Sequence, residues 1–477
     1  MSGFIEGEDR SQATLFPERI DDYIAEDNAV RVIDVFVGGL DLSGLGFKTM
    51  PEATGRPPYH PAVMLKLYIY GYMNRIQSSR RLEREAGRNL ELMWLLGRLA
   101  PDFKTIANFR KNNGEAIRLV CREFVLLCRK LELFTDAFVA IDGSKFKAVN
   151  NRNRNFTKTK IKKRLQQIDD NIARYLGQIE SADRREGDVA EAKKERLADK
   201  IKRLEQEMQS LKKLDVRLQT TPDHQISLTD PDARAMATSG RGTGVVGYNV
   251  QAAVDAEHHL IVAHEVTNVG HDRAQLANMA LQAKEATDED ALAVVADRGY
   301  YSSHEIRACE EAGITTYIPK NLTSGNQAKG YFGRQDFVYH ADDDEYECPA
   351  GERLIYRFTR EEAGKTLHRY WSSACPQCSR HAECTSGKHR RVSRWEHEAV
   401  LELVEDRMER EPERMRVRRN TVEHPFGTIK SWMGQTHFQM RTQRHVSTEM
   451  SLHVLAYNLK RVLRIMGAAP LMEAIGS

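Results

Sequence analysis

The sequence contains no apolar run long enough to cross a membrane. A spanning helix needs about 18 consecutive, mainly apolar residues, and no stretch of this chain approaches that length. The first ten residues, MSGFIEGEDR, are acidic and contain no apolar segment of the kind that a secretory signal requires. These two absences argue against a membrane-spanning or secreted protein, and we expect a cytoplasmic protein with no membrane partner.

Cysteine is scarce, and neither sign of charge is in large excess. Seven unevenly spaced cysteines in 477 residues do not resemble the disulfide framework of a secreted domain. The 71 basic and 68 acidic residues leave a net charge of only +3, which by itself does not indicate a nucleic-acid partner. Basic residues do gather locally, at 158–164, at 388–394 and again at 414–419. Such runs matter only if they lie beside a site that binds phosphates.

The composition is that of a globular protein, with 41% hydrophobic and 29% charged residues, and the length suits two to four structural units. Residues 1–133 are predicted to form a helical domain with helices at 60–74 and 79–96 and a short helix capped by Asp102 or Thr105. Pro61 suits a first helical turn, and Gly97 can end the second helix. Short helices followed by a basic one permit a DNA-binding helix-turn-helix, but a plain packing module explains the pattern equally well.

From residue 134 the pattern changes to strands that alternate with helices. Strands are predicted at 137–142, 247–254, 259–265, 292–297 and 315–319, and helices at 274–286 and 303–312. This order predicts an α+β or α/β core, in which helices cover a mixed sheet. The core is expected over residues 134–320 and 396–440, with helix over 396–419, and residues 441–477 are expected to form an amphipathic C-terminal helix.

Two insertions are predicted to interrupt this core. In the first, over residues 155–218, apolar residues alternate at spacings of three and four along two stretches on either side of a loop at 184–188. This pattern predicts an antiparallel helical hairpin whose arms pack on each other, while a coiled coil between chains or a DNA-tracking arm stays open. The second insertion covers residues 321–395 and is rich in cysteine.

The cysteine-rich insertion carries four thiols spaced for a metal site. Cys348, Cys375, Cys378 and Cys384 follow the pattern C-x26-C-x2-C-x5-C, and thiolates bind Zn²⁺ in tetrahedral sites. We therefore expect a structural zinc ion that folds this small unit, with His381 as an alternative ligand and redox chemistry at the close cysteine pair as the lesser alternative. The other three cysteines lie in helical or apolar contexts and are expected to be inert.

Three carboxylates carry the candidate chemistry. Asp142 and Asp297 each end a short apolar run that predicts a buried strand followed by a turn, whereas Glu423 lies in a basic, helical stretch. Two strand-end aspartates and one helix glutamate can meet around a pair of Mg²⁺ or Mn²⁺ ions. Such a site activates an oxygen nucleophile and stabilises a leaving oxygen in phosphoryl transfer.

The motifs around these carboxylates resemble DDE transposases of bacterial insertion sequences. The resemblance runs from the segment GRPPYH at 55–60 to the last helix, and its most specific parts are IDGS at 141–144 and ADRGY at 296–300. In related families a third signature reads Tyr, two residues, Arg, three residues, Glu, six residues, Lys. Arg419, Glu423 and Lys430 keep this register, and Arg416 replaces the tyrosine. Arg419, Glu423 and Lys430 are expected on one helix face, although Pro425 should kink or restart that helix.

The resemblance implies a function and a set of partners. It implies an RNase H-like core that cleaves transposon ends and joins them to target DNA with two metal ions. The expected partner is double-stranded DNA, both terminal inverted repeats and target, bound by a homodimer. A metal-dependent nuclease without strand transfer and a catalytically inactive zinc-containing DNA-binding protein stay open as alternatives.

The resemblance also implies roles for individual residues. Asp142 would bridge the two metal ions, and Asp297 and Glu423 would each hold one. Arg298, Arg419 and Lys430 would bind phosphates, Asn420 would position a base, and Arg416 belongs to the same DNA-binding set. Asp255 and Asp272 compete for the second carboxylate position, and Asp230 and Asp232 are further acidic candidates that a turn explains more simply.

Overall fold

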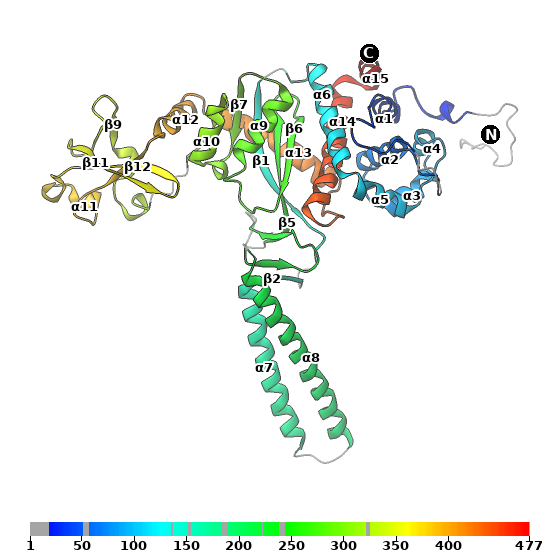
Figure 1. Cartoon of the computed structure of the whole chain (residues 1–477), viewed down its shortest axis with the longest axis horizontal. Helices are drawn as coiled ribbons and strands as arrows, with labels where there is room; N and C mark the ends of the chain where they lie inside the picture. Colours follow the sequence, from blue (N-terminus) through cyan, green and yellow to red (C-terminus); the bar gives the residue numbers. More distant parts are fainter. Residues whose placement is uncertain are drawn as a thin grey trace, which may run out of the picture.

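The computed structural model describes residues 19–50, 57–134, 137–150, 154–183, 188–221, 223–237, 244–320 and 325–476. Residues 55–56 of the predicted GRPPYH motif and residues 184–187 of the predicted loop lie outside these ranges. A sheet covered by helices forms the centre of the molecule, with a bundle of helices on one side and a strand-rich module on the other (Figure 1). Two long helices project from the end of the central sheet. Within the described ranges, none of the helices combines the length and apolar character that crossing a membrane requires.

The central sheet has an antiparallel half and a parallel half. Its strands are β1 (Phe138–Lys147), β4 (Arg234–Met236), β5 (Val245–Asp255), β6 (Ile261–Thr267), β7 (Leu292–Ala296) and β8 (Ile314–Tyr317). They follow the order β4-β5-β1-β7-β8, and β6 pairs with β5. β1 runs antiparallel to β5 and parallel to β7, which in turn runs parallel to β8. Helix α9 (Leu276–Thr287) leads from β6 into β7, and α10 (Ser303–Glu311) connects the parallel strands β7 and β8. The predicted mixed α/β core is therefore confirmed, and its sheet fits an RNase H-like arrangement.

The prediction that the first strand ends in a turn at Asp142 is wrong. β1 continues to Lys147, and Asp142 pairs with Ala252 in the middle of the ladder. The reason is that β5 is long enough to pair with β1 from Val139 to Lys147, so the chain keeps its backbone hydrogen bonds beyond the aspartate.

The N-terminal part is helical, as predicted. It comprises η1 (Ile20–Tyr23), α1 (Ala29–Gly38), α2 (Pro61–Met73), α3 (Ser79–Ala86), α4 (Leu90–Leu95), α5 (Phe103–Asn112) and α6 (Gly114–Lys130). Asp102 caps α5 by accepting the backbone N–H groups of Lys104 and Thr105. The single helix predicted over 79–96 is instead two helices, because Asn89 accepts the N–H of Leu92 and so caps a new helix.

The chain after residue 395 is divided more finely than predicted. It forms α12 (Glu398–Arg410), α13 (Arg414–Gly427), the π-helical turn η7 (Thr428–Trp432), α14 (Gln443–Met466) and α15 (Ala468–Gly476). The helix predicted over 396–419 breaks at 411–413, where Pro412 cannot donate a backbone hydrogen bond. Pro425 lies inside α13, and the helix changes to the π-helical turn three residues later.

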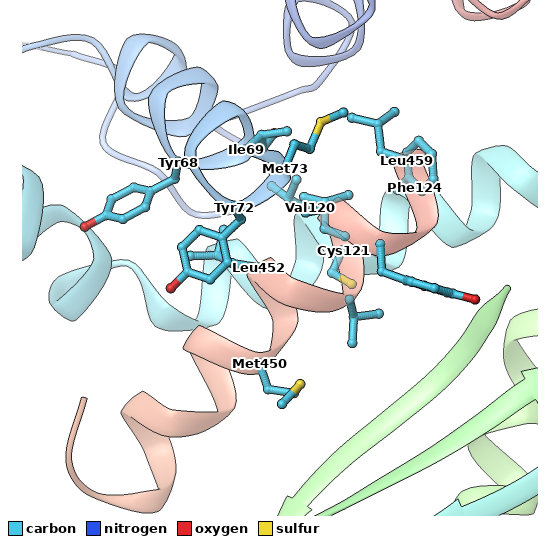
Figure 2. Close-up of a cluster of buried hydrophobic side chains, with 14 of the residues drawn as sticks. Tyr68, Ile69, Tyr72, Met73, Val120, Cys121, Phe124, Met450, Leu452 and Leu459 are labelled. Carbon is cyan, nitrogen blue, oxygen red and sulfur yellow. The ribbon is translucent and has the colours of Figure 1, made fainter. Parts of the chain in front are cut away.

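Helix α14 is buried on most of its surface and is not the amphipathic helix that the sequence predicts. It packs against α2 and α6 on one side and β6 on the other (Figure 1). Figure 2 shows Leu452 and Leu459 of α14 among buried residues of α2 and α6, such as Tyr72 and Phe124. Asn458 exchanges two hydrogen bonds of 2.9 Å with the backbone of Ile261. α14 therefore joins the N-terminal helices to the free edge of the central sheet.

The predicted helical hairpin is present as α7 (Lys158–Asp183) and α8 (Asp188–Gln219). The two arms pack through an apolar stripe, and its residues are Ile161, Leu165, Ile168, Ile172, Leu204, Met208, Leu211 and Leu218. The short strands β2 (Asn155–Thr157) and β3 (Gln225–Ser227) pair at the base of the hairpin. The apolar residues of the two arms thus pack against each other within one chain, which is the arrangement that the sequence favours.

The cysteine-rich insertion contains a five-stranded antiparallel sheet. Its elements are η4 (Gln327–Lys329), η5 (Arg334–Asp336), β9 (Val338–His340), β10 (Glu345–Glu347), β11 (Arg353–Glu362), β12 (Lys365–Trp371), η6 (Cys375–Gln377), α11 (His381–Cys384) and β13 (Val392–Trp395). A small core of its own includes Tyr346, Leu354 and Tyr370. Two of the four cysteines, Cys348 and Cys384, pack against this core.

Candidate active site and family

Asp142 and Asp297 lie on neighbouring parallel strands. Ile141 of β1 is in register with Ala296 of β7, and each aspartate follows the paired residue directly. Because parallel strands in register present successive residues side by side, the two carboxylates come to the same edge of the parallel half. The Asp142 side chain is 25% exposed and that of Asp297 is 43% exposed, so both are open to a ligand from solvent.

One arginine of α13 contacts both carboxylates. Nη2 of Arg418 lies 2.9 Å from Oδ1 of Asp142 and 3.6 Å from Oδ2 of Asp297. α13 packs across β1, β5 and β7, which brings Arg418 over the strands. The sequence did not single out Arg418, although its neighbour Arg419 belongs to the recognised signature. No feature of the sequence indicates which of these adjacent arginines faces the sheet.

A third carboxylate, Asp272, lies beside this pair. Its Oδ1 accepts hydrogen bonds of 2.7 Å from the side-chain amides of Asn249 and Gln251, and Lys145 lies 3.7 Å from its Oδ2. A Cβ atom at Gly143 would clash with Nε2 of Gln251 and lie 2.7 Å from Oδ1 of Asp272, so a larger residue here would displace the side chains that surround Asp272. The structure thus brings Asp272 to the site.

Asp255, which competed with Asp272 on sequence alone, lies elsewhere. It pairs with Val139 near the other end of β1, and its carboxylate accepts the backbone N–H of His258 at 2.6 Å. It therefore holds a turn beyond the end of β5.

Asp230 and Asp232 form a turn that caps α14. Asp230 accepts the backbone N–H of Thr442 at 3.0 Å, and Asp232 accepts that of Gln443 at 2.9 Å. Carboxylates at the start of a helix satisfy its free N–H groups and complement its dipole. These residues are structural, as the turn interpretation favoured.

The charges around Asp142 affect its protonation. Burial raises the pKa of Asp142 to about 6, Arg418 and the N–H of Gly143 act to lower it, and the nearby Asp297 and Asp272 act to raise it. Opposing effects of this kind are common where several carboxylates and a cation share a site. The charge of Arg418 therefore favours the ionised form of Asp142.

Lys430 reaches the same region from the π-helical turn. Its Nζ donates a hydrogen bond of 2.5 Å to Oγ of Ser144 and lies 4.5 Å from the ring centroid of Phe146. Burial lowers the pKa of Lys430, and the proximity of Asp142 acts to raise it. Lys430 thus lies near the carboxylates and contacts the residues of β1 that follow Asp142.

Glu423 lies on the exposed face of α13. Arg416, Arg419 and Asn420 are exposed on the same helix, at the spacing that places them on one face with Glu423. Among the described residues, no hydrogen bond or ion pair holds Glu423 toward the aspartates, and Arg418, which contacts both of them, does not pair with it. Arg298 is likewise exposed and follows Asp297 directly.

The four cysteines of the insertion surround one pocket, which His381 also lines. Burial raises the pKa of Cys384, and Cys348, Cys375 and Cys378 add to that rise, while Arg390 opposes it. The thiols are therefore close enough to interact electrostatically. Nevertheless, within the described ranges no three His, Cys, Asp or Glu side chains are arranged so that they could hold a metal ion.

Two known protein families match parts of this chain. Residues 18–112 match a family described as a transposase domain of the DUF772 type. Residues 214–459, more than half of the chain, match the transposase DDE domain. The chain belongs to the DDE transposases.

The second match places Asp272, Asp297, Arg418 and Glu423 of the transposase inside the DDE domain, whereas Asp142 precedes it. None of the curated proteins matches the transposase. Among solved structures it is similar to the piggyBac transposase synaptic complex with hairpin DNA, with 8% identity and a TM-score of 0.30. That match covers 94% of this chain and 79% of the other, but a similarity of this strength supports no structural conclusion.

Proposed function

We propose that this DNA transposase cleaves transposon ends and joins them to target DNA with divalent metal ions held by Asp142, Asp297 and Glu423. The observation that supports this most directly is the convergence of Asp142 and Asp297 on one cationic group. Carboxylate oxygens are the ligands that Mg²⁺ and Mn²⁺ prefer, so the two aspartates fit such an ion. When bound, two metal ions would supply activation of the attacking oxygen and neutralisation of the leaving oxygen.

The third ligand must come from α13 in this proposal. Arg418 precedes Glu423 in the chain and contacts the carboxylate of Asp142 on β1. Lys430 follows Glu423 and contacts the hydroxyl of Ser144, also on β1. The segment that carries Glu423 is therefore fixed over the aspartates, and the exposed side chain has to turn toward them. Asp272 is held by Asn249 and Gln251, which suits an orienting role.

Basic residues of the same region would hold the DNA backbone. Arg298, Arg416, Arg419 and Lys430 would each bind a phosphate near the carboxylates, and Asn420 would position a base. Lys162 and Lys163, near the start of α7, are also exposed and would offer further positive charge to DNA. We also propose that residues 1–133 form a DNA-binding domain and that a cytoplasmic homodimer pairs two transposon ends.

A joint assay of cleavage and joining tests the proposal. The purified protein would be incubated with Mg²⁺, a labelled duplex that ends in the element's terminal repeat, and a plasmid target. We expect nicked or cut repeat ends and, in addition, repeat DNA covalently joined to the plasmid. Cutting without joining would identify a nuclease, and binding without either reaction would identify an inactive DNA-binding protein.

A structural zinc ion in the insertion is a further part of the proposal. Four thiols around one pocket are a suitable donor set for Zn²⁺, with His381 as a possible replacement for one of them. We expect about one zinc per chain by elemental analysis of the purified protein. Cys378→Ser should lose this zinc and lower the melting temperature, whereas Cys309→Ser, at a buried thiol of α10, should keep it. Equal zinc contents in the two variants would contradict the assignment.

A further inference from the structure

Arg418 provides the positive charge that lies between the carboxylates in this structure. Its side chain is 13% exposed, and a single nitrogen approaches both Asp142 and Asp297. The guanidinium is mostly covered by the protein, whereas the two carboxylates are partly exposed. The contact therefore holds together two acidic groups that would otherwise repel each other.

We propose that Arg418 competes with a divalent ion for Asp142 and Asp297, and must leave them before the ion can bind both. This inference rests on the proposed function of these aspartates as metal ligands. Asp142 and Asp297 would hold a divalent ion beside the guanidinium that contacts both of them, and the two cations would repel each other. Arg418 is thus a positioning residue: it keeps the carboxylates together while the site lacks metal and weakens metal binding.

The incomplete hydrogen bonding of Arg418 favours its release from Asp142 and Asp297. Its Nε is buried and, in the described structure, has no hydrogen-bond partner. A buried donor without a partner is unfavourable, so the guanidinium is not fully stabilised in its present place. Arg419, the neighbouring arginine of the recognised signature, is exposed and, in the described part of the chain, makes no ion pair with the aspartates. The competition is therefore specific to one position of α13.

Manganese binding without DNA tests this inference. Free Mn²⁺ would be measured by electron paramagnetic resonance during titration of the full-length protein. Arg418→Gln, which removes the charge but keeps a polar side chain, should bind Mn²⁺ about tenfold more tightly than the wild type. Arg416→Gln removes one charge from the exposed face of the same helix and should change the affinity by less than about twofold.

Two further variants make the outcomes distinguishable. Asp142→Asn should lose the tight Mn²⁺ site; if it binds Mn²⁺ like the wild type, the metal assignment and this inference both fail. If Asp142→Asn loses binding but Arg418→Gln gains none, or gains no more than Arg416→Gln, only the inference about Arg418 fails. Should circular dichroism show that Arg418→Gln is unfolded, Arg418→Lys decides the question. The lysine side chain is shorter and competes less well for the two carboxylates, so this variant should bind Mn²⁺ a few-fold more tightly than the wild type.

Discussion

Replacing Asp142 with alanine is expected to abolish both DNA cleavage and strand transfer while leaving the binding of transposon ends intact. Asp142 lies next to Asp297 and within 2.9 Å of Arg418, so its loss removes the carboxylate that the other groups surround. Stabilisation of a phosphoryl-transfer transition state by metal ions amounts to several kcal/mol, which corresponds to a rate loss of roughly a thousandfold or more. Cleavage and joining would be measured on gels, and end binding by a mobility shift.

Asp255→Asn is the matched control for this experiment. Burial also raises the pKa of Asp255 to about 6, but its carboxylate only holds the turn to His258, and asparagine keeps a hydrogen-bond acceptor. The control should retain cleavage and joining. Retained cleavage by Asp142→Ala in Mg²⁺ would refute the assignment of Asp142.

The same assay can identify the third carboxylate. Glu423→Gln should behave like Asp142→Ala if Glu423 turns toward the aspartates. Asp272→Asn should keep measurable activity, because an amide can still accept from Asn249 and Gln251. The opposite pattern would make Asp272 the third ligand.

The second large effect is expected for stability, at Glu449 in the second turn of α14. This carboxylate is fully buried and accepts the backbone N–H groups of Gln439 and Met440 at 2.9–3.0 Å. It also faces the positive charge of Arg110, which is 6% exposed and donates a hydrogen bond of 2.6 Å to the hydroxyl of Tyr72. Glu449 thus connects the N-terminal helices with the segment that leads into α14.

Glu449→Ala is expected to destabilise the protein by about 3 kcal/mol, because it leaves backbone donors unsatisfied and a buried cation without its counter-charge. The melting temperature should fall by roughly 5 °C, because the entropy of unfolding of so long a chain is large. Glu473→Ala, at an exposed position of α15, should change it by no more than a degree or two. A melting temperature of Glu449→Ala close to that of the wild type would show that this contact does not hold the two parts together.

Much of the fold could be predicted from the sequence, because the signals for its elements are local. Apolar spacing predicted the two arms of the hairpin, and Asp102 predicted the start of α5. The predictions were wrong where contacts with distant segments of the chain decide the local structure. The sequence around Asp142 suggests a turn, but the long partner strand β5 keeps β1 extended. α14 carries polar residues and was predicted to be amphipathic, yet other parts of the chain cover nearly all of it.

By itself, the sequence determined the kinds of elements, the order of the carboxylates and the family motifs around them. Only the tertiary structure decided which charged groups meet. Asp142 and Asp297 are 155 positions apart in the chain and become neighbours through the register of two parallel strands. Arg418, and not Arg419, faces them, because successive helix residues point about 100° apart and the packing of α13 on the sheet selects one direction. Neither the strand register nor the helix rotation is set by nearby residues alone, so neither can be inferred from local sequence.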